Sequence, residues 1–426
     1  MSELYLESSG ALPIVSFALA FRSGSAHDPP GKEGLARITA RMLRRGADGL
    51  GAEQIEDAVD ALGAEFGADA TISTTSAHFE VIKRNLDPFV DLVSRLLGAP
   101  TFDQAELDRL VREAQSEIVE ARDNDRTLAS RAFRRTLFAD HPYARRSSGS
   151  IASLASITRA DVVAFYERHY TRENALVAIS GDIDRPRAEA AFERALARLP
   201  RGAKIEDPTP EPAPPSGRHL VFVDKPDRTQ TQMCVGGLGS HAHDPDHYEL
   251  LVGNTVFGGT FTSRLMAEVR SKRGWSYGAS SRAGFDRRRE AFTMWTAPAA
   301  TDAAACLALE LDLVKQLRAD GIREDELAFA KNYLSRSHAF EIDTARKRVH
   351  QPLDVAIFDL PADYYSGYLA SVAAVRLDGA NRALHRRVPE DDLVVAVVGT
   401  YSEIGAALEK AIPNLGRVTV QPFDFE

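Results

Sequence analysis

Two side chains that could act on a peptide bond, Arg270 and Tyr277, lie seven residues apart in the segment GGTFTSRLMAEVRSKRGWSYG, residues 258–278. A tetrahedral oxyanion formed at a peptide carbonyl needs a hydrogen-bond donor where its charge develops, and a phenol hydroxyl supplies one. A guanidinium adds a charged donor for a substrate carbonyl or carboxylate. The alternative interpretation is a sheet aromatic at Tyr277 and a solvated arginine at Arg270, in a helix rich in arginine.

A second segment has side chains at a spacing that could serve a chemical function. It is GLARITARM at residues 34–42, and it carries positive charge. If residues 34–45 are helical, Arg37 and Arg41 lie one turn apart and share a face, with Ala40 next to them. Side chains at this spacing could hold a metal, but a guanidinium does not deprotonate in proteins. Two permanent positive charges repel a divalent cation. The sequence therefore predicts no zinc at these positions.

A third segment gathers residue types that suit zinc, namely His241, His243, His247, Asp244 and Asp246. No helix or strand in the sequence pattern fixes their spacing. We interpret them as a polar turn that leads into a helix, and metal binding by the three histidines stays open as the alternative.

The framework GG-x-x-x-SRL-x-x-x-x-R-x-x-x-G-x-x-Y at residues 258–277 resembles the substrate-contacting segment of the pitrilysin/insulinase family of zinc peptidases, the inverzincins. That family places the zinc motif H-x-x-E-H on a helix in the other half of the chain. The matching residues here are Arg37, Ala40 and Arg41, so both histidines and the glutamate base are replaced. The resemblance implies that Arg270 and Tyr277 face a metal across a substrate chamber.

The third zinc ligand of the family is a glutamate further along the chain. Aligning Phe102, Glu106, Leu107 and Arg109 with the family pattern places it at Glu117. Glu117 is then either a solvated helix position or a carboxylate that pairs with Arg37 or Arg41 where metal would sit.

The resemblance covers both halves and is closest to two-domain bacterial members that assemble from two different subunits. In such pairs one subunit carries the zinc motif and the other the Arg/Tyr pair. The chain resembles the second kind: inactive alone and without bound zinc, it would supply Arg270 and Tyr277 in trans to the zinc of a homologous H-x-x-E-H partner that cleaves peptides. Two alternatives remain, a catalytically dead scaffold or peptide-binding homodimer, and an independent metallopeptidase that uses His241, His243 and His247.

Length, charge and hydrophobicity limit the number of domains, the classes of partner and the compartment. With 426 residues the chain suggests two or more domains, and a net charge of −9 without a basic tract argues against nucleic acid as a partner. No apolar run approaches the roughly 18 residues of a membrane span. Residues 11–21 lack a basic n-region and are expected to form a strand, not a signal peptide. The compartment stays open between cytoplasm and periplasm. Cys234 and Cys306 are expected to be small core residues.

An internal duplication is expected to position these residues. Three landmarks return 216 to 220 residues later: the loop at 24–29 with His27 at 239–245, the Phe102 segment at 322–327, and the apolar run 174–181 at 392–399. Residues 201–217 contain five prolines and predict a semi-rigid linker. The sequence thus predicts an N-terminal domain at 1–203, a linker at 204–217 and a C-terminal domain at 218–426.

Within each half the pattern predicts α+β structure, a mostly antiparallel sheet with helices on one face. The resemblance implies a clamshell arrangement of the two domains. A capping box at Asp103 and Glu106 predicts a helix that runs toward Leu137, and residues 303–317 predict a helix that stops at Gly321. Trp275, where the family pattern has leucine, either widens a packed contact or shapes a pocket.

Overall fold

The computed structural model describes residues 3–207 and 209–425; Pro208 of the linker lies outside them, as do residues 1, 2 and 426. The chain forms two compact units, and each unit takes segments from both halves of the sequence. The first unit comprises Met1–Ile118, Arg145–Thr209 and Ala339–Leu360. The second unit comprises Val119–Ala144, Pro210–His338 and Pro361–Glu426.

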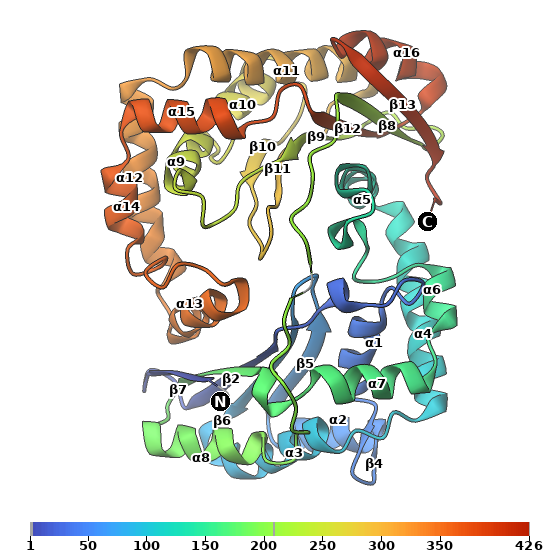
Figure 1. Ribbon diagram of the computed structural model, residues 1–426, viewed down its shortest axis with the longest axis vertical. Helices are drawn as coiled ribbons and strands as arrows, with labels where there is room; N and C mark the ends of the chain where they lie inside the picture. Colours follow the sequence, from blue (N-terminus) through green and yellow to red (C-terminus); the bar gives the residue numbers. More distant parts are fainter. Residues whose placement is uncertain (1–2, 208, 426) are drawn as a thin grey trace. The chain divides into compact units, whose positions relative to one another are not determined.

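The first unit is built on a five-stranded sheet in the order β1-β7-β2-β6-β5 (Figure 1). The strands are β1 Glu3–Ser8, β2 Ile14–Phe21, β5 Ala64–Ala70, β6 Thr75–Ile82 and β7 Ala175–Gly181. Only β1 and β7 pair in parallel, and the other neighbours are antiparallel. A short hairpin of β3 Gly46–Ala47 and β4 Leu50–Gly51 stands apart.

The helices of the first unit lie mostly on one face of its sheet, where inward residues of β2 such as Val15, Leu19 and Phe21 join a large apolar core. They are η1 Ser25–His27, α1 Leu35–Met42, α2 Ala52–Ala61, η2 Lys83–Asn85, α3 Leu86–Gly98, α4 Gln104–Glu120, α6 Ile151–Ser156, α7 Arg159–His169, η5 Arg172–Asn174 and α8 Arg185–Ala195.

The second unit repeats this sheet with one added strand, in the order β10-β11-β9-β12-β8-β13. The strands are β8 Arg218–Asp224, β9 Gln232–Leu238, β10 Ala279–Ala283, β11 Ala291–Thr296, β12 Leu393–Gly399 and β13 Leu415–Pro422. Its helices are η3 Ala121–Asp123, α5 Asp125–Phe138, η4 Pro142–Ala144, α9 His247–Phe257, α10 Arg264–Met266, the π-helix η6 Ala267–Lys272, η7 Ala300–Asp302, α11 Ala303–Asp320, most of α12 Glu324–Glu341, α14 Tyr368–Ala374, α15 Leu377–Arg387 and α16 Tyr401–Ala411. The matching strand order supports the duplication inferred from the sequence.

One helix from the opposite half of the sequence covers the second face of each sheet. In the first unit, α13 (Ala345–Phe358) packs on β7, where Leu176 and Ala178 meet Val349 and Leu353. In the second unit, α5 packs on β12, β9 and β8. Because both faces are covered, β7 and β12 are continuous apolar runs rather than alternating strands. The α+β class is confirmed, with the addition that helices cover both faces.

The helix predicted to run from Asp103 toward Leu137 is two helices. Asp103 caps α4 as predicted, because its Oδ1 accepts from the backbone amides of Ala105 and Glu106 at 2.8 and 3.3 Å. However, α4 ends at Glu120, and Asn124 caps a new helix by accepting from the amide of Thr127 at 2.9 Å. The break is where the chain leaves the first unit for the second, so the compact units do not follow the linear boundaries 1–203 and 218–426.

The helix at 303–317 and the two cysteines match the expectations from the sequence. The helix at 303–317 is α11, which ends at Asp320 and is followed by Gly321 with φ 70°, a positive value that glycine tolerates. Cys234 and Cys306 are both buried and free. The described part of residues 201–217 contains no helix or strand, as expected of a linker. None of the helices within 3–207 and 209–425 is long and apolar enough to cross a membrane.

Candidate functional site

The helix that carries the residues at the family's metal positions is α1, and its start is set by Asp28. Gly34, with φ 99°, turns the chain into the helix. The Asp28 carboxylate accepts from the amides of Gly34 and Ala36, both at 2.8 Å, which satisfies two amides of the first turn. Burial raises the pKa of Asp28 to about 7, although these amides oppose the shift. Helix α1 is shorter than the predicted 34–45 and ends at Met42.

Arg37 and Arg41 both reach Glu117 on α4. Nη1 of Arg37 lies 3.1 Å from one carboxylate oxygen of Glu117, and Nη1 of Arg41 lies 2.7 Å from the other. Arg37 also binds Asp69 on β5 through Nε at 2.9 Å. The pairing of Glu117 with these arginines, one of two interpretations drawn from the sequence, is confirmed. All four side chains are partly exposed, so each pair contributes at most about 1 kcal/mol.

These residues do not fit zinc. A zinc ligand set needs neutral imidazoles, thiolates or carboxylates within about 2.3 Å of the ion, and here two guanidinium groups hold the Glu117 carboxylate. Ala40, at the position of the catalytic base, is fully buried and has no group that could take a proton. Within the described residues, no three His, Cys, Asp or Glu side chains form a group that could hold a metal ion.

The contact of Glu117 with both arginines allows a direct test of the ancestry of this site. We expect the double variant Arg37→His/Arg41→His to bind zinc, because two imidazoles would replace two cations around a carboxylate that already lies between them. Adding Glu117→Gln should weaken binding by at least roughly tenfold, since even changes outside the ligand shell cost 10- to 100-fold. Isothermal titration calorimetry with zinc measures both constants. Zinc binding that is absent, or indifferent to Glu117, would contradict the assignment.

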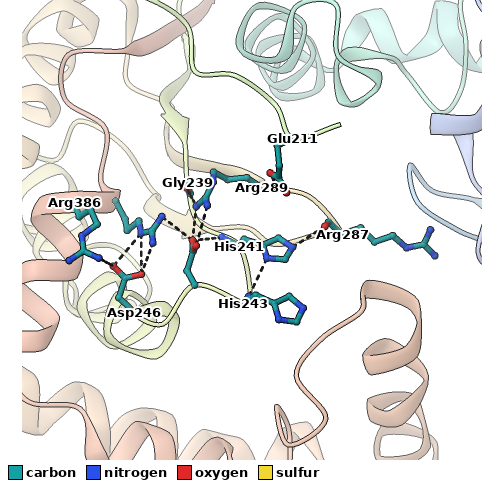
Figure 2. Close-up of polar contacts among 10 residues, drawn as sticks. Glu211, Gly239, His241, His243, Asp246, Arg287, Arg289 and Arg386 are labelled. Carbon is teal, nitrogen blue, oxygen red and sulfur yellow. Dashed lines mark hydrogen bonds and ion pairs between the residues drawn. The ribbon is translucent and has the colours of Figure 1, made fainter. Parts of the chain in front are cut away.

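The histidine segment at 241–247 is held by hydrogen bonds and ion pairs within the second unit (Figure 2). Nε2 of His241 lies 2.9 Å from the carbonyl oxygen of Arg287, and Nδ1 accepts from the amide of His243. His247 contacts the hydroxyl of Tyr364 at 2.9 Å, and burial lowers its pKa to about 4.

The two aspartates of this segment are committed to arginines. Asp244 binds Arg289 at 2.5 Å and Arg387 at 3.0 Å, and Asp246 binds Arg387 at 2.8 Å and Arg386 at 3.2 Å (Figure 2). Carboxylates paired with guanidinium groups are poor metal ligands, because a cation would have to displace the arginines. The segment is a structural turn ahead of α9, as the polar-turn interpretation predicted.

Arg270 is on the π-helix η6, on the surface of the second unit. The neighbouring residues Leu265 and Val269 are fully buried in the core, which fixes the backbone of this segment. Arg264, of the SRL triplet, binds both carboxylate oxygens of Glu326 at 2.8 and 2.5 Å and is therefore structural. The guanidinium of Arg270 instead lies over the ring of Phe261, 4.5 Å from its centroid.

Phe261 is a residue that sequence reasoning missed. It is 68% exposed, which is unusual for a large aromatic. Its separation of nine residues from Arg270 matches no helix or strand period, and only the turn between α9 and α10 brings the two together. Its presence in the motif was the one available signal.

Tyr277 is in the short segment between η6 and β10, and its side chain is 88% exposed. The preceding residue, Ser276, is buried, and its hydroxyl accepts a hydrogen bond from the amide of Ala297 at 3.1 Å. The backbone beside Tyr277 is therefore anchored. Trp275 packs against the core of the second unit with the guanidinium of Arg273 5.4 Å from its ring centroid. Within the described residues, no hydrogen bond or cation–π contact joins Arg270 and Tyr277.

Two family models match the chain. Residues 4–149 match the model described as "Insulinase (Peptidase family M16)", and residues 156–334 match "Peptidase M16 inactive domain". Among solved structures, the crystal structure of a peptidase M16 inactive domain from Pseudomonas fluorescens has a TM-score of 0.87 at 27% identity, covering 93% of this chain and 96% of that one. A structure of a protease from Helicobacter pylori has a TM-score of 0.82 at 16% identity and shares the fold.

Curated relatives include a protein named as a non-peptidase homologue and one named as a zinc protease. One from Helicobacter pylori, described as "Non-peptidase homolog YmxG", is 23% identical over 394 residues, 92% of this chain and 90% of that protein. Another, an "Uncharacterized zinc protease" from Rickettsia bellii, is 26% identical over 321 residues, 75% of this chain and 76% of that protein.

Proposed function

Because the chain belongs to the insulinase family, peptidase family M16, we propose that it is the zinc-less subunit of a peptidase made of two different subunits. The partner is a homologue with an intact H-x-x-E-H motif, which holds the zinc and the catalytic base. This chain binds the peptide substrate and supplies Arg270 and Tyr277 to the shared reaction.

One contrast within the molecule carries this proposal. The arginines at the metal positions are tied to Glu117 by ion pairs of 2.7 and 3.1 Å, whereas Tyr277 is 88% exposed and Arg270 has no acidic partner among the described residues. Groups committed to each other in the folded chain cannot act on a substrate. Side chains held on an anchored backbone with open hydrogen-bond donors can do so.

The roles of the two residues follow from their chemistry. The Tyr277 hydroxyl donates a hydrogen bond to the oxygen on which charge develops when a peptide carbonyl is attacked. The guanidinium of Arg270 holds a substrate oxygen by charge-assisted hydrogen bonds and orients the peptide. The proposal retains the sequence halves 1–203 and 218–426, joined by the linker at 204–217, as the duplicated modules of this subunit.

Mixing the chain with an H-x-x-E-H homologue from the same genome tests the proposal. We expect the purified chain to contain no stoichiometric zinc by elemental analysis and to cleave no unstructured peptide, because Arg37, Ala40 and Arg41 supply neither ligand nor base. The mixture should cleave such peptides faster than the homologue alone, and a chelator should stop the reaction.

The scaffold alternative makes a different prediction for the same experiment. A peptide-binding homodimer would leave the homologue's rate unchanged on mixing, and size exclusion would show the chain eluting without the homologue. A dead scaffold would assemble with the homologue, but the rate of the mixture would not depend on Arg270 or Tyr277. One zinc per chain, together with chelator-sensitive cleavage by the chain alone, would contradict both the two-subunit proposal and the scaffold alternative. It would favour metal binding by His241, His243 and His247.

A further inference from the structure

The cations of the motif segment differ in what holds them. Arg264 binds Glu326 at 2.5 Å, and Lys272 and Arg273 bind Glu268 at 2.5 and 2.6 Å. Within the described residues Arg270 has no such carboxylate, and its guanidinium lies over the ring of Phe261. Two glutamates therefore neutralise three of these four cations and leave the fourth on an aromatic surface.

The turn that presents Phe261 is fixed on both sides. The amides of Gly258 and Gly259 both donate to the carbonyl oxygen of Asn254 at 2.9 Å, and the carbonyl of Gly258 accepts from the amide of Ser281 at 3.0 Å. A Cβ at Gly258 would lie 2.3 Å from Oγ of Ser281, so only glycine allows this approach. After Phe261, the side chain of Ser263 caps α10. The exposed ring is thus set on a constrained backbone.

At 4.5 Å from the ring centroid, a guanidinium can stack on the ring by its flat face. Its five N–H donors are in the plane and point outward from the edges, so they stay available for a planar acceptor. Such a fork matches a carboxylate, which it can bind through two parallel hydrogen bonds. The ring restricts the orientation of the guanidinium but leaves its positive charge in place. An acidic partner would neutralise that charge.

We propose that Phe261 and Arg270 form a carboxylate clamp, in which the ring orients the guanidinium to bind an anionic group of the peptide. The inference rests on the proposed function for its biological setting and names its substrate class: peptides that present an Asp or Glu side chain or a free C-terminal carboxylate. Phe261 is a positioning residue, since it acts through Arg270.

Peptide binding to the full chain alone tests the clamp without requiring a partner or turnover. The probes are fluorescein-labelled decapeptides of Ala, Gly and Ser in matched pairs: one central Asp against Asn with amidated C-termini, and a C-terminal acid against amide with no internal charge. Fluorescence anisotropy at low salt should show roughly tenfold tighter binding of at least one acidic member, the lower end for a hydrogen bond to a charged group. The pair that shows it identifies the source of the carboxylate.

Variants separate the clamp from general charge attraction. Arg270→Gln should abolish the acid preference, whereas Arg273→Gln, a nearby cation already paired with Glu268, should retain it. Phe261→Leu should reduce the preference about two- to fivefold, the value of an exposed cation–π contact, and Phe261→Tyr should preserve it.

Three outcomes overturn the proposal. Equal binding of acidic and neutral peptides contradicts the clamp, and so does a preference that survives Arg270→Gln. A preference lost in Arg270→Gln but unchanged in Phe261→Leu contradicts the role of the ring. Each result is independent of whether the mixed subunits cleave peptides, so failure of the clamp and failure of the two-subunit proposal are distinguishable.

Discussion

Arg270→Ala and Tyr277→Phe are each expected to lower peptide cleavage by the reconstituted pair by roughly 10²- to 10³-fold, the loss seen when an oxyanion donor is removed. Tyr277→Phe deletes only a hydroxyl from a side chain that is 88% exposed, so its effect on folding should be within about 0.5 kcal/mol. The loss should appear mainly in kcat for Tyr277→Phe, because charge on the substrate oxygen develops only in the transition state.

The matched control is Arg273→Ala, which removes a cation from the same segment that is already bound to Glu268. It should leave cleavage nearly unchanged. Size exclusion of each mixture shows whether the pair still assembles. Full activity in both the Arg270 and the Tyr277 variants, with assembly intact, would refute the catalytic contribution and favour a scaffold.

The second large effect concerns Glu310 on α11, and it is a loss of stability as pH rises. Its side chain is 1% exposed, and Oε1 accepts from the hydroxyl of Thr296 at 2.5 Å and lies 3.9 Å from the sulfur of Cys306. The groups that face it, Thr296 and Cys306, carry no positive charge. Burial therefore raises the pKa of Glu310 from 4.5 to about 7.

The sign of the pH dependence follows from linkage. Between about pH 4.5 and pH 7 the folded state keeps a proton on Glu310 that the unfolded state has lost, so the free energy of unfolding falls as pH rises. The difference between the folded and unfolded pKa values of Glu310 corresponds to a decrease of order 3 kcal/mol in the free energy of unfolding. This decrease is complete above pH 7. The stabilising contribution is fully present only below the unfolded pKa.

Urea unfolding at pH 5 and pH 8, followed by tryptophan fluorescence, measures this loss. Trp275 and Trp295 are both in the second unit, and Trp295 is adjacent to Thr296 in β11. Glu310→Gln should remove this loss, because a neutral amide replaces the buried acid. The pH dependence that remains in the second unit includes the opposite contribution of His247, whose pKa is lowered by burial. The exposed Asp312→Asn on the same helix is the control and should behave as the unaltered chain. Equal pH dependence in both variants would contradict the assignment to Glu310.

Much of the candidate site follows from spacing within single segments. Arg37, Ala40 and Arg41 share a helix turn wherever the helix lies, and two guanidinium groups exclude zinc from that turn in any fold. The capping residue Asp103 and the stop at Gly321 are likewise local, because a cap depends on the backbone within a few residues. The duplication is also visible in sequence, since corresponding segments keep their order and separation.

Contacts between segments that are distant in the sequence could be identified only from the tertiary structure. The uniform apolar runs of β7 and β12 indicate burial on both faces, but not that α13 and α5 provide the second cover. Asn124 caps α5 locally, but only the tertiary structure shows that α5 belongs to the second unit. Which cation of residues 264–273 lacks a glutamate depends on where Glu326 and Phe261 lie. Residue types and their periods thus determined the kind of secondary structure that each segment forms. Which distant segments contact one another is decided by packing, which no local pattern encodes.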